Sequence, residues 1–184
     1  MILASASPRR QELLEREGIA FQVMPQDVDE KRQPGEAPRS MVERLAVAKA
    51  KACRDANPDL DDTILAADTI VWRGNVIFNK PTDEESAARM LESLSDTTHY
   101  VSTGVAIISG DRCVSFVETT KVTFRDISDA EIESYVATGE CADKVGSYAI
   151  QGGAAGFVDR VEGDYDNVVG LPVKRVLEEL EKLK

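Results

Sequence analysis

The chain has 184 residues, of which 42% are hydrophobic and 30% are charged, and these values are typical of one globular domain with its own core. Its formal net charge is −11, from 22 basic and 33 acidic side chains, which argues against general binding to nucleic acid or to an anionic membrane surface. The 3 cysteines are far apart and His99 is the single histidine, so a zinc site is not expected.

The first part of the chain predicts strands that alternate with helices. In chain order we expect a strand over 1–4, a helix from Pro8 to just before Gly18, a strand over 21–24, a polar loop over 25–38, a helix over 39–56 and a buried strand over 63–72.

The second part continues the alternation and adds a hairpin. We expect a turn at 73–75, a short strand over 76–78, a helix with Thr82 and Glu85 as capping box, and two strands over 100–108 and 112–125. A helix follows that is capped by Ser128 and Glu131 and closed by Gly139. The chain then continues with a glycine-rich segment over 146–158 before a strand, and with an amphipathic helix over 171–184. We therefore expect a single domain over 1–184 of the α/β class, with a mixed, twisted sheet flanked by helices.

The cysteines and the apolar runs also predict where the protein is found. An odd number of widely spaced cysteines suits reduced thiols. Met1 begins directly in a strand-like run, and no apolar run approaches the length that spans a bilayer. We expect a cytoplasmic protein with no membrane partner.

The start of the first predicted helix is a candidate anion site. Ser7 suits the N-cap position before Pro8, so the unpaired N–H groups and the positive end of the helix dipole would face the hydroxyls of Ser5 and Ser7. Arg9 and Arg10 lie beside them and add positive charge. The same residues also suit a well-capped surface helix with solvated arginines.

Two charged residues interrupt apolar patterns. Asp68 lies within the run TILAADTIVW, where an unpaired carboxylate is costly unless it has a partner, a metal ion or a function, or reaches water at the strand end. Lys49 lies on the apolar stripe of its helix, and its ammonium points inward unless the side chain extends past the helix end. Opposite charges on neighbouring elements favour a shared polar site.

Two further charged residues and the absence of some common motifs limit which ligands and reactions the sequence suits. Lys80 precedes a proline in a loop and can reach a phosphate, and Glu30 lies in the acidic loop DVDEKR, which can supply oxygen ligands; both positions also suit exposed surface. With one histidine, the remaining metal candidates are Mg²⁺ or Mn²⁺ held by carboxylates and phosphate oxygens. The sequence has no P-loop, no GxGxxG fingerprint and no GxSxG elbow.

In combination, SASPRR, the inward Lys49, AADT, NKP and GSYAIQGG resemble the Maf family of nucleoside triphosphate pyrophosphatases, proteins once called septum formation inhibitors. The resemblance extends from Leu3 to beyond Gly170. It implies a fold like that of the Maf and ITPase proteins, with the active-site cleft between two lobes. It also implies hydrolysis of a nucleoside triphosphate, between its α and β phosphates, to a monophosphate and pyrophosphate.

The resemblance implies two groups of site residues. Those implied in substrate binding are Ser5, Ser7, Arg9, Arg10, Thr69 and Gln151. Those implied in catalysis are Glu30, Lys49, Asp68 and Lys80. Asp68 matches the general base, and with Glu30 it offers two carboxylates for a divalent metal ion, Mg²⁺ or Mn²⁺.

Three of these positions, Arg10, Thr69 and Gln151, match positions associated with base preference, and the segment YAIQG resembles the branch that acts on dTTP and UTP. Three alternatives stay open: another preference such as 7-methyl-GTP, a nucleotide-binding regulator of cell division without significant catalysis, and an anion-binding domain without chemistry. The expected partner is the triphosphate substrate, without nucleic acid, and a homodimer is compatible with the terminal helix or an edge strand.

Overall fold

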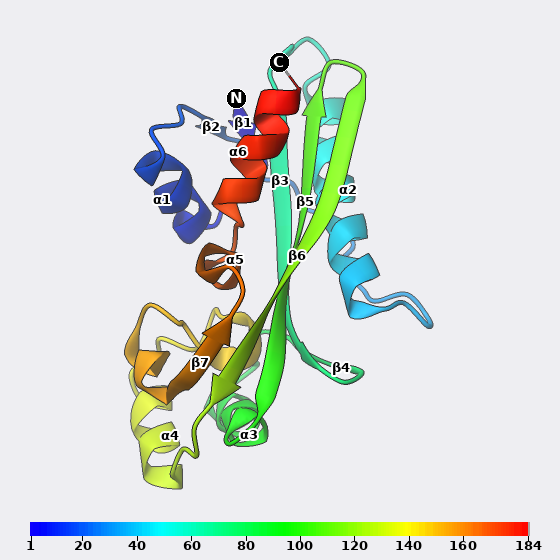
Figure 1. Cartoon of the computed structure of the whole chain (residues 1–184). Helices are drawn as coiled ribbons and strands as arrows, with labels where there is room; N and C mark the ends of the chain where they lie inside the picture. The colour runs from blue at the N-terminus through cyan, green and yellow to red at the C-terminus, as the bar shows by residue number, and fades with distance from the viewer. Residues whose placement is uncertain (184) are drawn as a thin grey trace. The chain divides into compact units, whose positions relative to one another are not determined.

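The computed structural model describes residues 1–183, and Lys184, the last residue of the predicted terminal helix, lies outside the described residues. Its strands form one seven-stranded sheet in the order β2-β1-β3-β5-β6-β7, with β4 paired to β3 (Figure 1). The strands are β1 (Ile2–Leu3), β2 (Gln22–Val23), β3 (Ile64–Arg73), β4 (Val76–Phe78), β5 (Thr98–Ser109), β6 (Arg112–Phe124) and β7 (Val158–Glu162). β1 pairs in parallel with β2 and β3, whereas β3–β4 and β6–β7 are antiparallel. The predicted mixed sheet is confirmed.

Helices lie between several of the strands in the order of the chain and also follow the last strand. They are α1 (Pro8–Arg16), α2 (Pro38–Ala56), α3 (Glu84–Leu94), α4 (Asp129–Val136), α5 (Tyr165–Val169) and α6 (Val173–Lys182), with 3₁₀ helices η1 (Val145–Ser147) and η2 (Gly153–Phe157). Within residues 1–183, none of the helices combines the length and the apolar character needed to cross a membrane.

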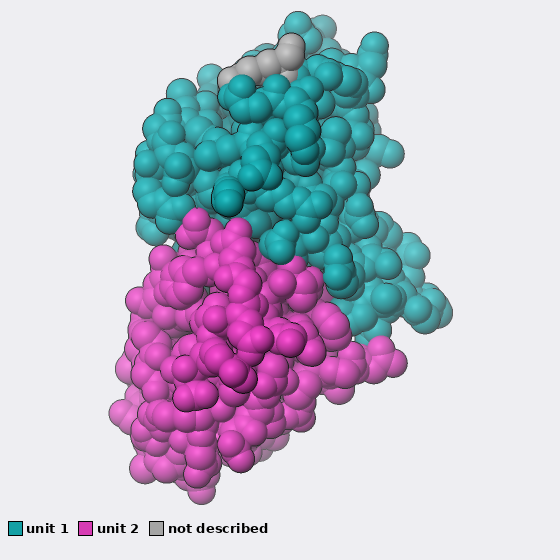
Figure 2. All heavy atoms as spheres, in the orientation of Figure 1, with its two compact units in different colours: residues 1–69, 103–118, 170–184 teal, residues 70–102, 119–169 magenta. Residues whose placement is uncertain are grey.

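The chain divides into two compact units, coloured teal and magenta in Figure 2. Unit 1 comprises residues 1–69, 103–118 and 170–184, and unit 2 comprises residues 70–102 and 119–169. The three long strands β3, β5 and β6 each contribute residues to both units. A single Maf-like domain over 1–184 stays a prediction.

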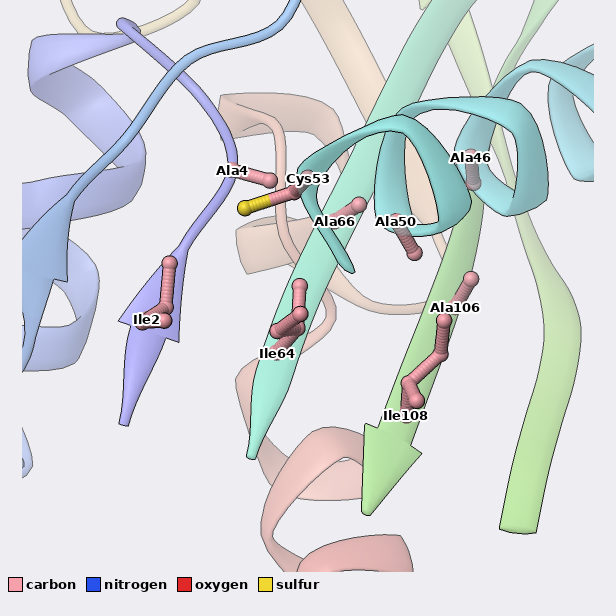
Figure 3. Packing of buried hydrophobic residues seen from close by; sticks show 9 residues of the cluster. All are labelled: Ile2, Ala4, Ala46, Ala50, Cys53, Ile64, Ala66, Ala106 and Ile108. Atoms are coloured by element: carbon pink, nitrogen blue, oxygen red, sulfur yellow. The ribbon is translucent and has the colours of Figure 1, made fainter. Parts of the chain in front are cut away.

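Unit 1 contains an apolar layer between α2 and the strands β1, β3 and β5, drawn in Figure 3. Its buried members are Ile2, Ala4, Ala46, Ala50, Cys53, Ile64, Ala66, Ala106 and Ile108. Many of these side chains are alanines, and small side chains let a helix lie close to a sheet. Gly104 continues the β5 face of 106 and 108, and a Cβ there would lie 2.2 Å from the carbonyl oxygen of Val42. The backbones of α2 and β5 are therefore in direct contact.

Unit 2 contains a cluster of aromatic side chains. His99 of β5 makes edge-to-face contacts with Phe124 and Tyr148, and Phe157 makes them with Phe124 and Tyr135. His99 is fully buried, and its Nε2 is 2.8 Å from the hydroxyl of Tyr148. Burial lowers the pKa of His99 to about 3, because the charged imidazolium would lose its hydration. The single histidine is therefore a neutral core residue.

The cap predicted for the third helix is wrong. α3 begins at Glu84 with Asp83 as N-cap, and the Asp83 carboxylate accepts the N–H of Ser86 at 2.6 Å. The Ser86 hydroxyl accepts the N–H of Asp83 in return, at 3.1 Å. Thr82 and Asp83 both offer an N-cap oxygen, and the ionised carboxylate is the stronger acceptor. The predicted box of Ser128 and Glu131 is confirmed, since the N–H of Ser128 donates to Glu131 at 2.9 Å.

Candidate active site

Lys49 of α2 lies between two carboxylates in unit 1. Its Nζ is 2.6 Å from Oδ1 of Asp68 on β3 and 2.6 Å from Oε1 of Glu30 in the loop before α2. The side chains of Lys49 and Asp68 are each 13% exposed, whereas that of Glu30 is 62% exposed. The structure thus brings together an inner buried ion pair and an outer carboxylate that water reaches.

The spacing of side chains along β3 and along α2 explains why Asp68 and Lys49 meet. In a strand every second side chain lies on the same face, so Asp68 follows Ile64 and Ala66 on the face that contacts α2. On the helix, Lys49 lies about two turns beyond Val42, where the backbone meets β5. Lys49 consequently points toward β3 at the end of the apolar layer, and its ammonium meets the first polar side chain on that face.

Arg10 of α1 is the centre of a second polar cluster in unit 1. Its Nη1 donates to the hydroxyl of Ser5 at 2.8 Å, its Nη2 to the hydroxyl of Thr69 at 3.0 Å, and its Nε to the carbonyl of Gly170 at 2.8 Å. The hydroxyls of Thr69 and Thr103 are 2.9 Å apart. Burial lowers the pKa of the Arg10 guanidinium, and the charge of the nearby Asp68 opposes this shift. Arg10 therefore joins three separate chain segments.

The α1 terminus has the predicted residues in their positions but not the predicted capping bond. Ser7 is the N-cap and Pro8 is the first helical residue. Within residues 1–183 the Ser7 hydroxyl makes no capping bond to the helix, and the Ser7 N–H instead donates to the hydroxyl of Ser5 at 3.3 Å. Arg9 is half-buried in the first turn. A helix start whose side-chain hydroxyl is not used as a cap keeps its amides available to an anion.

Lys80 and Gln151 lie in unit 2, whereas the other predicted site residues lie in unit 1. Lys80 is exposed after β4, in a loop whose Asn79 carbonyl accepts the N–H of Gly146 at 3.1 Å. Gln151 is exposed at a turn before η2. Their assignment to the same site as Lys49 and Asp68 stays a prediction.

Two residues that the sequence reasoning missed hold the segment around Gln151. The Tyr135 hydroxyl of α4 accepts the N–H of Ala149 at 3.1 Å, and the Glu140 carboxylate accepts the N–H of Gly153 at 2.9 Å. Gln151 is therefore exposed between Ala149 and Gly153, whose N–H groups are hydrogen-bonded to Tyr135 and Glu140. Burial also raises the pKa of Tyr135, which stays a neutral phenol in its contact with the segment.

Gly152 and Gly153 form a glycine pair at this turn. A Cβ at Gly152 would lie 2.0 Å from Oε1 of Glu140, so this glycine allows the carboxylate to approach the backbone. The pair indicates such an approach in the sequence, but it does not identify Glu140 as the partner.

Carboxylate oxygens are the ligands in unit 1 that a hard cation such as Mg²⁺ prefers. The carboxylates of Glu30 and Asp68 lie close enough together for both to contact the ammonium of Lys49. Within residues 1–183, no group of three or more His, Cys, Asp or Glu side chains could hold a metal ion.

Comparison with known proteins places the whole chain in one family. The model of the family "Maf-like protein" matches residues 1–183. The "dTTP/UTP pyrophosphatase" of Geobacillus sp. (strain WCH70) is 48% identical over 183 residues, which are 100% of this chain and 97% of that protein. The proteins of the same name from Bacillus cereus (strain AH820) and Bacillus anthracis are each 46% identical over 182 residues, 99% of this chain and 94% of theirs.

Proposed function

Because this chain belongs to the Maf-like protein family, we propose that it hydrolyses dTTP and UTP to the nucleoside monophosphate and pyrophosphate. The observation that carries this proposal is the 46–48% identity, over nearly the full length of both chains, with relatives named dTTP/UTP pyrophosphatase. The two polar clusters of unit 1 support the proposal, because they hold a carboxylate pair, an ammonium and a guanidinium that such a reaction could use.

In this reaction the oxygen of a water molecule attacks the α phosphorus, and the bond from that phosphorus to the oxygen bridging to the β phosphorus breaks. The attacking water loses a proton, and the pyrophosphate leaves with the bond electrons. The reaction therefore needs a base near the water and positive charge near the leaving group. We assign the base to Asp68, the buried carboxylate beside Lys49.

Positive charge would come from Arg9, Arg10, Lys49 and Lys80. The helix start with Ser5 and Ser7 would bind phosphate oxygens through hydroxyl and amide groups. Contacts within residues 1–183 use three N–H groups of Arg10, and a guanidinium has further donors for a phosphate oxygen. Arg10 would thus both join the walls of the site and bind the substrate.

A divalent metal ion, Mg²⁺ or Mn²⁺, fits the donor set of Glu30 and Asp68. One or two carboxylates together with substrate phosphate oxygens and water are the ligands with which proteins usually bind Mg²⁺. When bound, such an ion offsets phosphate charge and makes a water molecule more acidic.

Base preference would rest on Gln151, Thr69 and Arg10. The amide of Gln151 both donates and accepts hydrogen bonds, which suits the edge of a pyrimidine.

A cytoplasmic location is proposed with the same function, since the cysteines Cys53, Cys113 and Cys141 are all free thiols. A homodimer stays a prediction, and the elution volume in gel filtration would test it.

The experiment that tests the function is a substrate panel. The purified protein is incubated with Mg²⁺ or Mn²⁺ and each of dTTP, UTP, CTP, GTP, ATP and 7-methyl-GTP, and pyrophosphate and monophosphate are measured. We expect products from dTTP and UTP, and a loss of about 100- to 10,000-fold in Asp68→Asn, which keeps nucleotide binding. Preference for 7-methyl-GTP would change the assigned substrate, and no turnover of any nucleotide despite binding would contradict the proposed reaction. Near wild-type rates in Asp68→Asn would remove Asp68 from the base and metal roles.

A further inference from the structure

The ammonium of Lys49 has the same two oxygen contacts that a metal ion at Glu30 and Asp68 would need. It lies 2.6 Å from one oxygen of each carboxylate, and it donates a charge-assisted hydrogen bond to Asp68. A Mg²⁺ ion binds carboxylate oxygens at about 2.1 Å. The ammonium and a divalent ion at these carboxylates would therefore compete for the same pair of negative groups.

We propose that Lys49 is an internal counter-cation, which a divalent metal ion must displace from Glu30 and Asp68 before the site is loaded. The displaced ammonium stays on its flexible stem and becomes available to the triphosphate. The second half of this exchange rests on the proposed function, whereas the competition between Lys49 and a metal ion does not.

The unequal burial of the two carboxylates indicates where the exchange begins. The Glu30 side chain is 62% exposed and lies on a loop, so its ion pair with Lys49 is screened by water and held weakly. The pair of Lys49 with Asp68 is largely buried and is held more strongly. An incoming cation therefore meets Glu30 first, and Lys49 leaves Asp68 only when the metal ion replaces its charge.

The exchange makes metal and nucleotide binding depend on each other. Without nucleotide, a divalent ion must expel an ammonium whose ion pairs, within residues 1–183, are with these two carboxylates, and the ion binds weakly. With a triphosphate present, the expelled ammonium gains phosphate oxygens, and the ion binds more tightly. By linkage, the metal ion tightens nucleotide binding by the same factor.

The test measures Mn²⁺ binding to the whole protein without nucleotide, from the electron paramagnetic resonance signal of free Mn²⁺. We compare the wild type with Lys49→Met, which removes the ammonium and keeps an unbranched side chain. The matched control is Lys51→Met, which removes the same charge from an exposed position of α2. We expect Lys49→Met to bind Mn²⁺ roughly tenfold more tightly than the wild type, and Lys51→Met to stay within about twofold.

An unchanged or weaker Mn²⁺ affinity in Lys49→Met would overturn the proposal, because Lys49 would then support the carboxylates and not compete for them. Equal tightening in both variants would also overturn it, because the effect would be one of net charge. Lys49→Gln repeats the measurement if Lys49→Met proves unfolded by circular dichroism. Tighter Mn²⁺ binding without turnover of any nucleotide would support the competition and contradict only the pyrophosphatase function.

Discussion

Asp68 and Thr69 are neighbours in β3, and their side chains enter different polar clusters. Asp68 accepts from Lys49 of α2 at 2.6 Å, and Thr69 accepts from Arg10 of α1 at 3.0 Å. Adjacent residues of a strand point to opposite faces, so one dipeptide supplies both clusters. A shift of β3 by one residue would exchange these side chains and break both sets of contacts.

We expect Arg10→Lys to destabilise the protein by about 2 kcal/mol, because one ammonium cannot replace a planar guanidinium that donates to Ser5, Thr69 and Gly170. Urea unfolding measures the change. Arg16→Lys on the same helix is the control, because the Arg16 side chain is 51% exposed; we expect a change below about 0.5 kcal/mol there. Equal effects in the two variants would contradict the joining role of Arg10.

We expect Gly104→Ala to cost about 3 kcal/mol or more, because the added methyl group would overlap the carbonyl of Val42 and push α2 away from β5. The same shift would move Lys49 relative to Asp68, so activity would fall along with stability. Gly156→Ala is the control, since its Cβ would meet nothing within 4 Å. Thermal unfolding of both variants gives the comparison, and a Gly104→Ala protein as stable as Gly156→Ala would refute the close approach.

Glu140→Ala removes the acceptor of the Gly153 N–H and loosens the turn that presents Gln151. We expect the KM for dTTP to rise several-fold with little change in kcat, because Asp68 and Lys49, which are proposed to act in the reaction, are untouched. Glu140→Gln keeps an acceptor oxygen and should retain most of the affinity. Gly152→Ala should behave like Glu140→Ala, since its methyl group displaces the same carboxylate. A fall in kcat with unchanged KM would argue that the segment acts in some other way.

His99 makes stability depend on pH. Its pKa of about 3 in the folded protein lies below the ordinary value of 6.5, so the unfolded chain binds a proton that the folded protein does not. Stability from this residue is complete above pH 6.5 and falls below it, by a slope that approaches about 1.4 kcal/mol per pH unit. We expect His99→Phe to abolish the slope between pH 6 and pH 5 in urea unfolding.

The range from pH 6 to pH 5 separates the effect of His99 on stability from the effects of two carboxylates with lowered pKa values. Hydrogen bonds from Arg44 and Arg125 lower the pKa of Glu36 and of Glu131 to about 2, from 4.5 in both cases. The stability that these two groups contribute is therefore lost only as the pH falls below 4.5. A His99→Phe protein that keeps the wild-type slope above that pH would show that another group binds the proton.

Local signals predicted most of the elements. The Ser7-Pro8 start, the hairpin around Gly110 and the box of Ser128 and Glu131 each depend on residues within a few positions, and the structure confirms them. The helix α5 was not predicted, although Asp164 accepts the N–H of Asp166 at 2.8 Å in the manner of an N-cap. A helix of 5 residues is too short to show a period.

The contacts of the candidate site were predictable from the residues alone only where a charge broke an apolar pattern. Lys49 and Asp68 stand out because each places a charge on an apolar face, and the structure pairs them. Arg10 looks like any arginine near a helix start, because its acceptors Thr69 and Gly170 are 59 and 160 positions away. Glu140 has no local signal either, since its partner Gly153 is 13 positions away and across a turn.

The bond between Arg10 and the carbonyl of Gly170 also affects the order in which the protein is assembled during synthesis. The two residues are 160 positions apart, and Glu30, Lys49 and Asp68 leave the ribosome long before Gly170 does. A growing chain can therefore bring its charged residues together while Arg10 still lacks its last acceptor. The anchoring of the first helix is completed only after Gly170 has been synthesised.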